Sequence, residues 1–299
     1  MKFLVTGGAG FIGSHLCKEL VKRKNEVIVV DNLHTGSLDN LKEIKDKIKF
    51  INKSCGEITS EEIGKIDGIF HLGIYSSSPM YRENKKLVGM VINDFINILE
   101  LAKKRDTKIV FASSSSVYNN NPTPWKEEMN IKITDFYTEA RYLMERLAKL
   151  YDELYNVKSV GLRLFSVYGP NEKSKGKYAN LVSQFLWDME KNKSPIVYGN
   201  GEQRRDFIYV DDVSNAFIRA MDYNKTDIFN VGTGKDYSLN ELISMLNDLL
   251  GKNIKPKYIK NPIKNYVYKT KADTTKAKKL LNFEYTIDLK DGIKRLINI

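Results

Sequence analysis

The sequence is poor in the residues that build disulfide frameworks and metal centres. Its 299 residues include 2 cysteines and 3 histidines. Cys17 and Cys55 stand far apart, and His15, His34 and His71 lack the spacing of a metal-binding cluster. We therefore expect no metal site and no dependence on disulfides.

Long apolar runs are also missing. A membrane-spanning helix needs about 18 or more consecutive apolar residues, and no segment reaches that length. Glycines interrupt the apolar run after Val5, so this part of the sequence does not resemble a signal peptide. These observations predict a cytoplasmic protein without membrane contact.

Positive charge is in excess, but the lysines and arginines are spread along the chain rather than clustered. The chain carries 48 Lys and Arg against 37 Asp and Glu, a net charge of +11, and only 10 of the 48 are Arg. Nucleic-acid surfaces typically cluster Arg and Lys with aromatic residues between them, and no such stripe is present. We interpret the excess as a solvated lysine-rich surface, which would also attract an anionic substrate over long range. We expect no nucleic-acid partner.

Three glycines stand between an apolar strand and a helix near residue 10. Segment 2–6 reads as a strand, Gly7, Gly10 and Gly13 follow, and 14–20 continues as a helix. Glycine lets the backbone turn tightly and lets a diphosphate approach the amides. The start of the helix adds free N–H groups and the positive end of its dipole. The pattern predicts a dinucleotide-binding turn.

An acidic residue follows the next predicted strand. Segment 26–30 ends in Asp31, which lies 18 positions after Gly13. A carboxylate at this place would accept a hydrogen bond from an adenosine ribose hydroxyl and would repel a 2′-phosphate. We therefore predict NAD rather than NADP as the cofactor.

Strand and helix patterns alternate through the first half of the chain. Strands are predicted at 2–6, 26–30, 48–51, 67–72, 108–112 and 157–164, and helices near 11–24, 84–105 and 136–155. This alternation is typical of a doubly wound parallel α/β sheet of the Rossmann type, with ligands at the carboxyl ends of its strands. We predict an NAD-binding domain over 1–166, to which 207–233 contributes. A smaller substrate-binding domain is predicted over 167–299, with the site in the cleft.

Two segments carry side chains suited to acid–base chemistry. A predicted strand runs into four serines, 113–116, whose hydroxyls could satisfy a turn or donate to a substrate oxygen. Tyr137 and Arg141 stand four residues apart on a predicted helix and share one face. A neighbouring cation favours a phenolate, which suits a general base. Tyr142 and Arg146 have the same spacing, so spacing alone does not choose between the pairs.

Together these residues resemble the extended short-chain dehydrogenase/reductase family, above all its NAD-dependent nucleotide-sugar epimerases. The resemblance spans nearly the whole chain and rests on segments 6–13, 31–33, 113–118, 137–145, 162–170, 198–212, 230–234 and 271–281. It implies bound NAD, a nucleotide-sugar substrate such as a UDP-sugar, and a homodimer formed through helices 84–105 and 136–155.

The resemblance also implies roles for individual residues. Catalytic roles fall on Ser114, Tyr137 and Arg141. Cofactor contacts fall on Gly7, Gly10, Phe11, Ile12, Gly13, Asp31, Asn32, Gly36, Glu57, Ile58, Leu72, Gly73, Tyr137, Arg141 and Val167. Substrate contacts fall on Ser114, Ser115, Tyr137, Ser166, Tyr198 and Arg205. Arg205 matches the arginine expected on the diphosphate, and a guanidinium can bond two phosphate oxygens at once.

The chain departs from the pattern of this family at four places. Arg141 stands where the family has Lys, and Ser166 where it usually has Asn. Gly73-Ile74 replaces a common Ala-Ala, and segment 53–58 replaces the usual Gly-Asp-Ile-type contact with adenine.

The reaction that the resemblance implies is the epimerisation of a nucleotide sugar through a transient keto-sugar. We expect a UDP-hexose 4-epimerase. Dehydratases of the family place an Asp-Glu pair after the catalytic hydroxyl, where this chain has Ser115 and Ser116. A decarboxylase would likewise lack its acidic residue, so both reactions are less favoured. A sugar dehydrogenase that releases NADH and a non-catalytic NAD-binding sensor remain alternatives.

Overall fold

Seven apolar segments pair into one parallel sheet in the computed structural model, which describes residues 1–298. The strand order is β11-β6-β5-β4-β1-β2-β3, and every pairing is parallel. The strands are β1 (Lys2–Thr6), β2 (Glu26–Val30), β3 (Ile48–Ile51), β4 (Gly68–His71), β5 (Ile109–Ser114), β6 (Ser159–Leu164) and β11 (Asp227–Val231). Their almost continuous apolar sequences suit strands that are buried on both faces.

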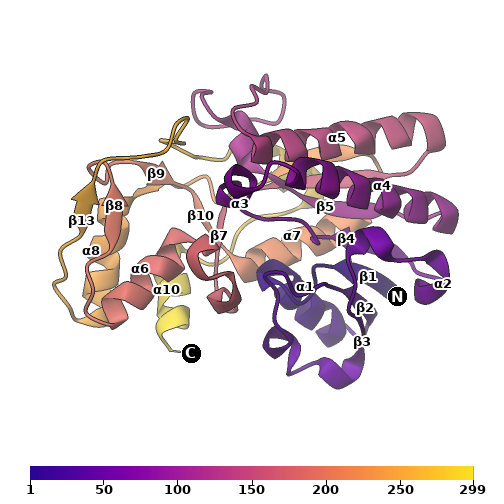
Figure 1. Ribbon diagram of the computed structural model, residues 1–299, viewed down its shortest axis with the longest axis horizontal. Coiled ribbons are helices and arrows are strands. Elements are labelled where there is room, and N and C mark those ends of the chain that lie inside the picture. Colours follow the sequence, from indigo (N-terminus) through magenta and orange to yellow (C-terminus); the bar gives the residue numbers. More distant parts are fainter. Residues whose placement is uncertain (299) are drawn as a thin grey trace.

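Helices cover both faces of this sheet. α1 (Phe11–Lys22) and α7 (Val210–Asp222) cover one face of the sheet, and α4 (Leu87–Arg105) and α5 (Phe136–Tyr155) cover the other, at the top of Figure 1. On one face Leu16 and Phe217 join the same buried cluster as Val29. On the other face Phe95 and Met144 pack in one cluster with Phe111. The predicted doubly wound Rossmann fold is thus confirmed.

Short helices complete the connections of the sheet. They are η1 (Leu38–Leu41), η2 (Lys45–Lys47), η3 (Cys55–Glu57), α2 (Ser60–Ile63), α3 (Ser78–Glu83) and η4 (Ser115–Tyr118). No helix among residues 1–298 combines the length and the apolar composition that a membrane crossing requires.

A second, smaller group of elements lies beside the sheet, at the left of Figure 1. It contains β7 (Ser166–Tyr168), η5 (Lys173–Tyr178), α6 (Leu181–Glu190), β8 (Ile196–Tyr198), β9 (Arg204–Arg205), β10 (Phe207–Tyr209), β12 (Tyr237–Ser238), α8 (Leu239–Leu250), β13 (Lys257–Ile259) and α10 (Leu289–Ile297). Phe185, Leu242 and Ile293 bring α6, α8 and α10 into one buried cluster. The strands form three two-stranded sheets.

The chain crosses between the two groups more than once. α7 and β11 return to the large sheet, and the contribution of the whole of 207–233 to the first domain stays a prediction. α9 (Thr275–Leu281) also packs beside β11 and α7, because Ala277 and Leu281 belong to the same buried cluster as the sheet. The exact boundary between 1–166 and 167–299 stays a prediction.

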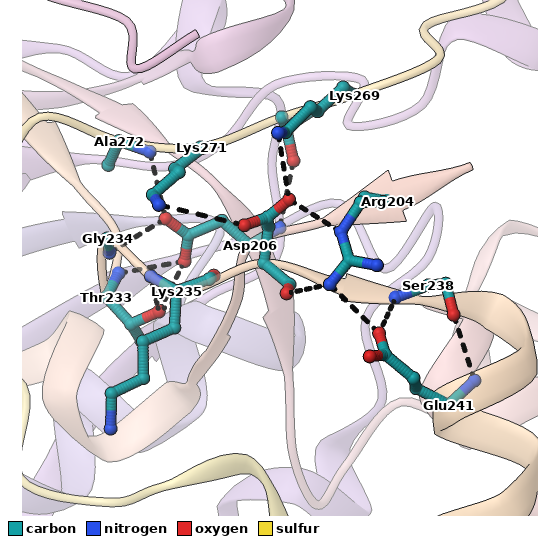
Figure 2. Close-up of polar contacts among 12 residues, drawn as sticks. Arg204, Asp206, Thr233, Gly234, Lys235, Ser238, Glu241, Lys269, Lys271 and Ala272 are labelled. Carbon is teal, nitrogen blue, oxygen red and sulfur yellow. Dashed lines mark hydrogen bonds and ion pairs between the residues drawn. The ribbon is translucent and has the colours of Figure 1, made fainter. Parts of the chain in front are cut away.

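A buried carboxylate joins three of the crossing segments (Figure 2). Asp206 is completely buried, between β9 and β10. Its oxygens accept the backbone N–H groups of Thr233 at 2.8 Å and of Gly234 and Ala272 at 2.9 Å. The Thr233 hydroxyl donates a fourth hydrogen bond at 2.7 Å. Asp206 therefore ties β10 to the turn after β11 and to the segment before α9.

Loss of this carboxylate should destabilise the whole chain. The substitution Asp206→Ala leaves three N–H groups without their acceptor, the buried one of Ala272 and the part-buried ones of Thr233 and Gly234. A buried donor without its acceptor typically costs about 1–3 kcal/mol. We expect the free energy of unfolding to fall by at least about 3 kcal/mol in urea titrations. The exposed Asp248 on α8 offers a control, because Asp248→Ala should change stability by less than about 0.5 kcal/mol. Equal stabilities of the two variants would contradict this account.

Candidate active site

A cavity of about 340 Å³ opens at the carboxyl ends of five strands of the large sheet. Gly7 after β1, Asp31 after β2, Leu72 after β4, Ser114 at the end of β5 and Leu164 at the end of β6 all line it. The chain leaves β1 toward β2 and β3, and it later returns to place β4 on the other side of β1. Such a switch in strand order opens a crevice, which is where ligands bind in this class of fold.

The glycine turn forms one end of the cavity. Gly7 has φ +68°, and a Cβ atom added at Gly13 would lie 2.1 Å from the Gly7 carbonyl oxygen. The turn therefore excludes larger residues, and it brings the start of α1 close to β1. No side chain caps the N-terminus of α1, so its first N–H groups can bind a phosphate. This geometry fits the diphosphate of a dinucleotide.

Asp31 is fixed at the edge of the cavity by the backbone. Its carboxylate accepts the N–H of Ala9 at 2.9 Å and the N–H of Leu33 at 2.7 Å. Burial raises the pKa of Asp31, and these backbone hydrogen bonds oppose the rise. Each carboxylate oxygen keeps a free lone pair that could accept a ribose hydroxyl. The residue therefore fits the ribose contact predicted for NAD.

Neighbouring serine hydroxyls have different partners. The Ser113 hydroxyl donates to a carboxylate oxygen of Glu145 at 2.6 Å and is thus engaged in the core. The Ser114 oxygen accepts the N–H of Ser116 at 3.2 Å, and Ser114 lines the cavity. Its own O–H therefore remains able to donate to a ligand. The structure distinguishes a structural serine from a serine that is available for chemistry.

Tyr137 reaches the same cavity from the first turn of α5. Asp135 caps this helix by accepting the N–H of Thr138 at 2.8 Å, and it also accepts the Ser78 hydroxyl at 2.7 Å. Tyr137 is half-buried and lines the cavity together with Ser114. Ser114 and Tyr137, to which the resemblance gives catalytic roles, thus line one cavity.

Arg141 lies one helical turn after Tyr137 and is almost completely buried. The carbon of its guanidinium group lies 4.7 Å from the centre of the Tyr137 ring, and Nη2 donates to the Tyr75 carbonyl oxygen. The Tyr81 hydroxyl donates to the same carbonyl at 3.1 Å, and its ring meets Tyr137 edge-on at 5.6 Å. Burial raises the pKa of Tyr81, so this phenol stays protonated. Arg141 is therefore fixed beside Tyr137 by residues of the loop after β4 and of α3.

His71 lies near this arrangement but carries no charge. It is fully buried, and its Nδ1 atom lies 2.8 Å from the Thr6 hydroxyl, which accepts the N–H of Gly73 at 3.0 Å. Burial, together with the charge of Arg141, lowers the pKa of His71 to about 3. At neutral pH the positive charge at this end of the cavity therefore belongs to Arg141.

Comparison with known proteins decides the family. Residues 3–232 match the model of the NAD dependent epimerase/dehydratase family. The chain belongs to this family. Its membership confirms the predicted resemblance and the prediction of NAD as cofactor, and it agrees with the glycine turn and with Asp31.

Individual relatives in this family align over almost the whole chain. A putative UDP-glucose 4-epimerase of Methanocaldococcus jannaschii is 38% identical, over 99% of this chain and 97% of that protein. The solved UDP-N-acetylglucosamine 4-epimerase of Methanobrevibacter ruminantium, in complex with UDP-N-acetylmuramic acid, superposes with a TM-score of 0.94 at 30% identity, covering 99% of this chain and 97% of the other. The UDP-glucose 4-epimerase of Thermotoga maritima, with UDP-glucose, gives a TM-score of 0.93 at 32% identity, covering 100% and 98%.

Other relatives in the family have different reactions. They carry the names UDP-glucuronate 4-epimerase, from Thermodesulfobacterium geofontis, and UDP-glucuronic acid decarboxylase, from Arabidopsis thaliana. The chain thus belongs to an enzyme family of NAD-dependent nucleotide-sugar epimerases and decarboxylases.

The structure brings most of the predicted family residues to the cavity, but not Glu57 and Ile58. The cavity lining includes Gly7, Gly10, Phe11, Ile12, Gly13, Asp31, Asn32, Gly36, Leu72, Gly73, Ser114, Ser115, Tyr137, Arg141, Ser166 and Val167. The Glu57 carboxylate instead accepts the N–H of Ser54, and Ile58 is buried in the core. Lys53, Ser54 and Cys55 line the cavity instead, because the chain turns into η3 at Cys55. The contact of Glu57 and Ile58 with the cofactor stays a prediction.

Tyr198 and Arg205 lie outside the residues that line this cavity. Both belong to the smaller group of elements and gather around Tyr266. The Arg205 guanidinium lies 5.3 Å from the Tyr266 ring centre, and the Tyr198 ring lies 6.5 Å from the same ring. Arg205 donates to the carbonyl oxygens of Val267 and Tyr268. Their contact with a diphosphate stays a prediction.

The sequence patterns missed three residues of the site. Tyr75 and Lys175 line the cavity although no motif points to them. Tyr81 does not line the cavity, but its hydroxyl donates to the carbonyl oxygen of Tyr75, which does. Each of these residues comes from a connection, where local patterns carry little information about long-range position.

Proposed function

We propose that this chain is an NAD-dependent UDP-hexose 4-epimerase. The observation that carries the proposal is the convergence of Ser114, Tyr137 and Arg141 on a cavity whose other end is the glycine turn. The family and the names of the most similar relatives support it.

The chemistry follows from the positions of these side chains. Tyr137 takes the proton of the sugar hydroxyl, and the positive charge of Arg141 favours the phenolate that this step needs. The free O–H of Ser114 donates to the reacting oxygen and holds it in place. NAD, held by the glycine turn and Asp31, would supply the acceptor for a hydride from the sugar carbon and the donor that returns it to the other face. When the keto-sugar is reduced, Tyr137 gives its proton back.

The distribution of carboxylates favours epimerisation over dehydration or decarboxylation. Among residues 1–298, the carboxylates that line the cavity are Asp31 and Asp94. Asp31 follows β2. Asp94 lies on α4 and accepts the hydroxyl of Ser54, which follows β3, at 3.1 Å. Ser115 and Ser116 follow Ser114, so no acid stands next to the reacting hydroxyl. A second proton transfer at a neighbouring carbon would lack its general base.

The direct test is sugar inversion by the purified protein. Incubation with UDP-glucose and with UDP-N-acetylglucosamine should give the corresponding galacto-epimer, detected by NMR of the product. Tyr137→Phe should reduce the rate about 10³-fold because the general base is lost, while bound NAD stays at the wild-type amount.

Tyr142→Phe, on the same helix, is the matched control and should keep the wild-type rate. Release of NADH with one oxidised sugar per turnover would show a dehydrogenase instead. Bound NAD that is never reduced by any sugar would show a sensor. A normal rate in Tyr137→Phe would remove the proposed base.

Substitution of Arg141 tests what its cation contributes. If the charge is what matters, Arg141→Lys should keep kcat within about tenfold, and Arg141→Met should lose about 10²-fold or more. The pH dependence of kcat reports the state of the base in both variants. A collapse of kcat in Arg141→Lys would instead mean that the guanidinium must reach the Tyr75 carbonyl and the Tyr137 ring together.

We also propose a homodimer that forms through α4 and α5, as the sequence predicts. These helices pack side by side and expose Met90, Leu150, Leu154 and Tyr155 to solvent. Leu154→Glu should convert a dimer into a monomer in size-exclusion chromatography with light scattering. Leu38→Glu, at an exposed residue outside these helices, should leave the mass unchanged. A wild-type monomer at micromolar concentration would contradict the proposal.

A further inference from the structure

Segment 169–180 lies across the first turn of α1. The Asn171 side chain donates to the Ser14 hydroxyl at 3.1 Å, and the Nε2 atom of His15 lies 3.3 Å from the Pro170 carbonyl oxygen. Ser14 and His15 come directly after Phe11, Ile12 and Gly13, which begin α1 and line the cavity. The segment is therefore fixed next to the place that suits a diphosphate.

One lysine of this segment points its charge toward that place. Lys175 lines the cavity, and its Nζ lies 5.3 Å from the centre of the Phe11 ring, at the first residue of α1. The side chain of Lys175 is only 15% exposed. A lysine so far removed from water needs a partner that holds its charge.

That partner is a buried glutamate. The Glu172 carboxylate has no exposed surface and lies 3.2 Å from the Lys175 ammonium. It also accepts the N–H of Asn180 at 3.0 Å and the hydroxyl of Ser183 in α6. Glu172 is thus fixed by its own segment and by α6. The ammonium has three N–H groups, so it keeps others for a second acceptor.

Each lysine and arginine side chain that lines the cavity among residues 1–298 already has a partner, so position decides which of them can meet a diphosphate. Among residues 1–298, the lysine and arginine side chains that line it are Lys53, Arg141 and Lys175. Lys53 pairs with Glu62 at 2.6 Å, and Arg141 is held by the Tyr75 carbonyl beside Tyr137. A diphosphate brings two negative charges into the cavity, and Lys175 is the cation placed at its glycine end.

We propose that Lys175 binds a diphosphate in this cavity and that Glu172 holds its ammonium in the binding position. The diphosphate could be that of NAD or that of the UDP-sugar, since both ligands present the same group. The inference rests on the proposed function for the identity of the two ligands. Lys175 would add a charged contact beside the glycine turn, which otherwise offers backbone N–H groups to a diphosphate.

Lys175→Met tests the proposal by binding rather than by turnover. The measurements are the NAD that remains bound after purification, the Kd of NAD for protein stripped of it, and the Kd of UDP for the NAD-loaded protein. We expect about tenfold weaker binding of at least one ligand. Lys173→Met removes the same charge from an exposed position of the same segment and should change neither Kd.

The pattern of losses identifies the diphosphate. Weaker NAD binding assigns Lys175 to the cofactor, weaker UDP binding assigns it to the substrate, and unchanged Kd values for both overturn the proposal. Lys175→Arg keeps the charge and should stay within about threefold of the wild type. If Lys175→Met does not fold, the same proposal predicts that Lys175→Gln weakens binding.

A second readout separates charge from packing. The difference in Kd between wild type and Lys175→Met should shrink as ionic strength rises, because salt screens the contact. A difference that does not depend on salt would overturn the electrostatic role. If the wild type binds NAD and UDP but inverts no sugar, the proposed epimerase activity is contradicted, whereas the proposed role of Lys175 in binding is not.

Discussion

The buried ion pair between Glu145 and Arg163 sets the geometry on which the site depends. The two side chains are 5% and 4% exposed, and they meet at 2.6 Å and 2.9 Å through two separate N–H groups of Arg163. Glu145 also accepts the Ser113 hydroxyl, so α5 is tied to both β5 and β6. Removal of either ion would leave an uncompensated charge in the core, which typically costs about 3–5 kcal/mol. Tyr137 lies two turns before Glu145, and this anchor therefore determines where its phenol stands relative to Ser114.

Similar side chains near the cavity have different hydrogen-bond partners and charges, and these differences decide which of them can take part in chemistry. The Ser113 hydroxyl donates its hydrogen bond to Glu145, whereas the Ser114 hydroxyl remains able to donate to a ligand. Neutral His71 is confined to the core, whereas Arg141 carries the charge next to Tyr137. Since all of these groups have fixed partners before any ligand arrives, little reorganisation is needed at the moment of reaction.

The two ends of the cavity are built from distant parts of the chain. The glycine turn and Asp31 come from the first strands, and the segment with Glu172 and Lys175 comes from the connection to the smaller group. Asp206 holds that smaller group to the sheet through backbone N–H groups of two other segments. A ligand that spans the cavity would thus contact both groups of elements at once.

The sequence by itself determined what depends on local backbone chemistry. The glycine turn, the position of Asp31 and the alternating apolar strands are decided by sterics and patterning within a few residues, and the fold followed from them. Only the tertiary structure decided that Ser113 donates its hydroxyl to Glu145 while Ser114 does not, that Lys53–Cys55 rather than Glu57 and Ile58 line the cavity, and that Lys175 stands over Phe11. These outcomes depend on long-range packing and on the exact end of short turns, which no local pattern encodes.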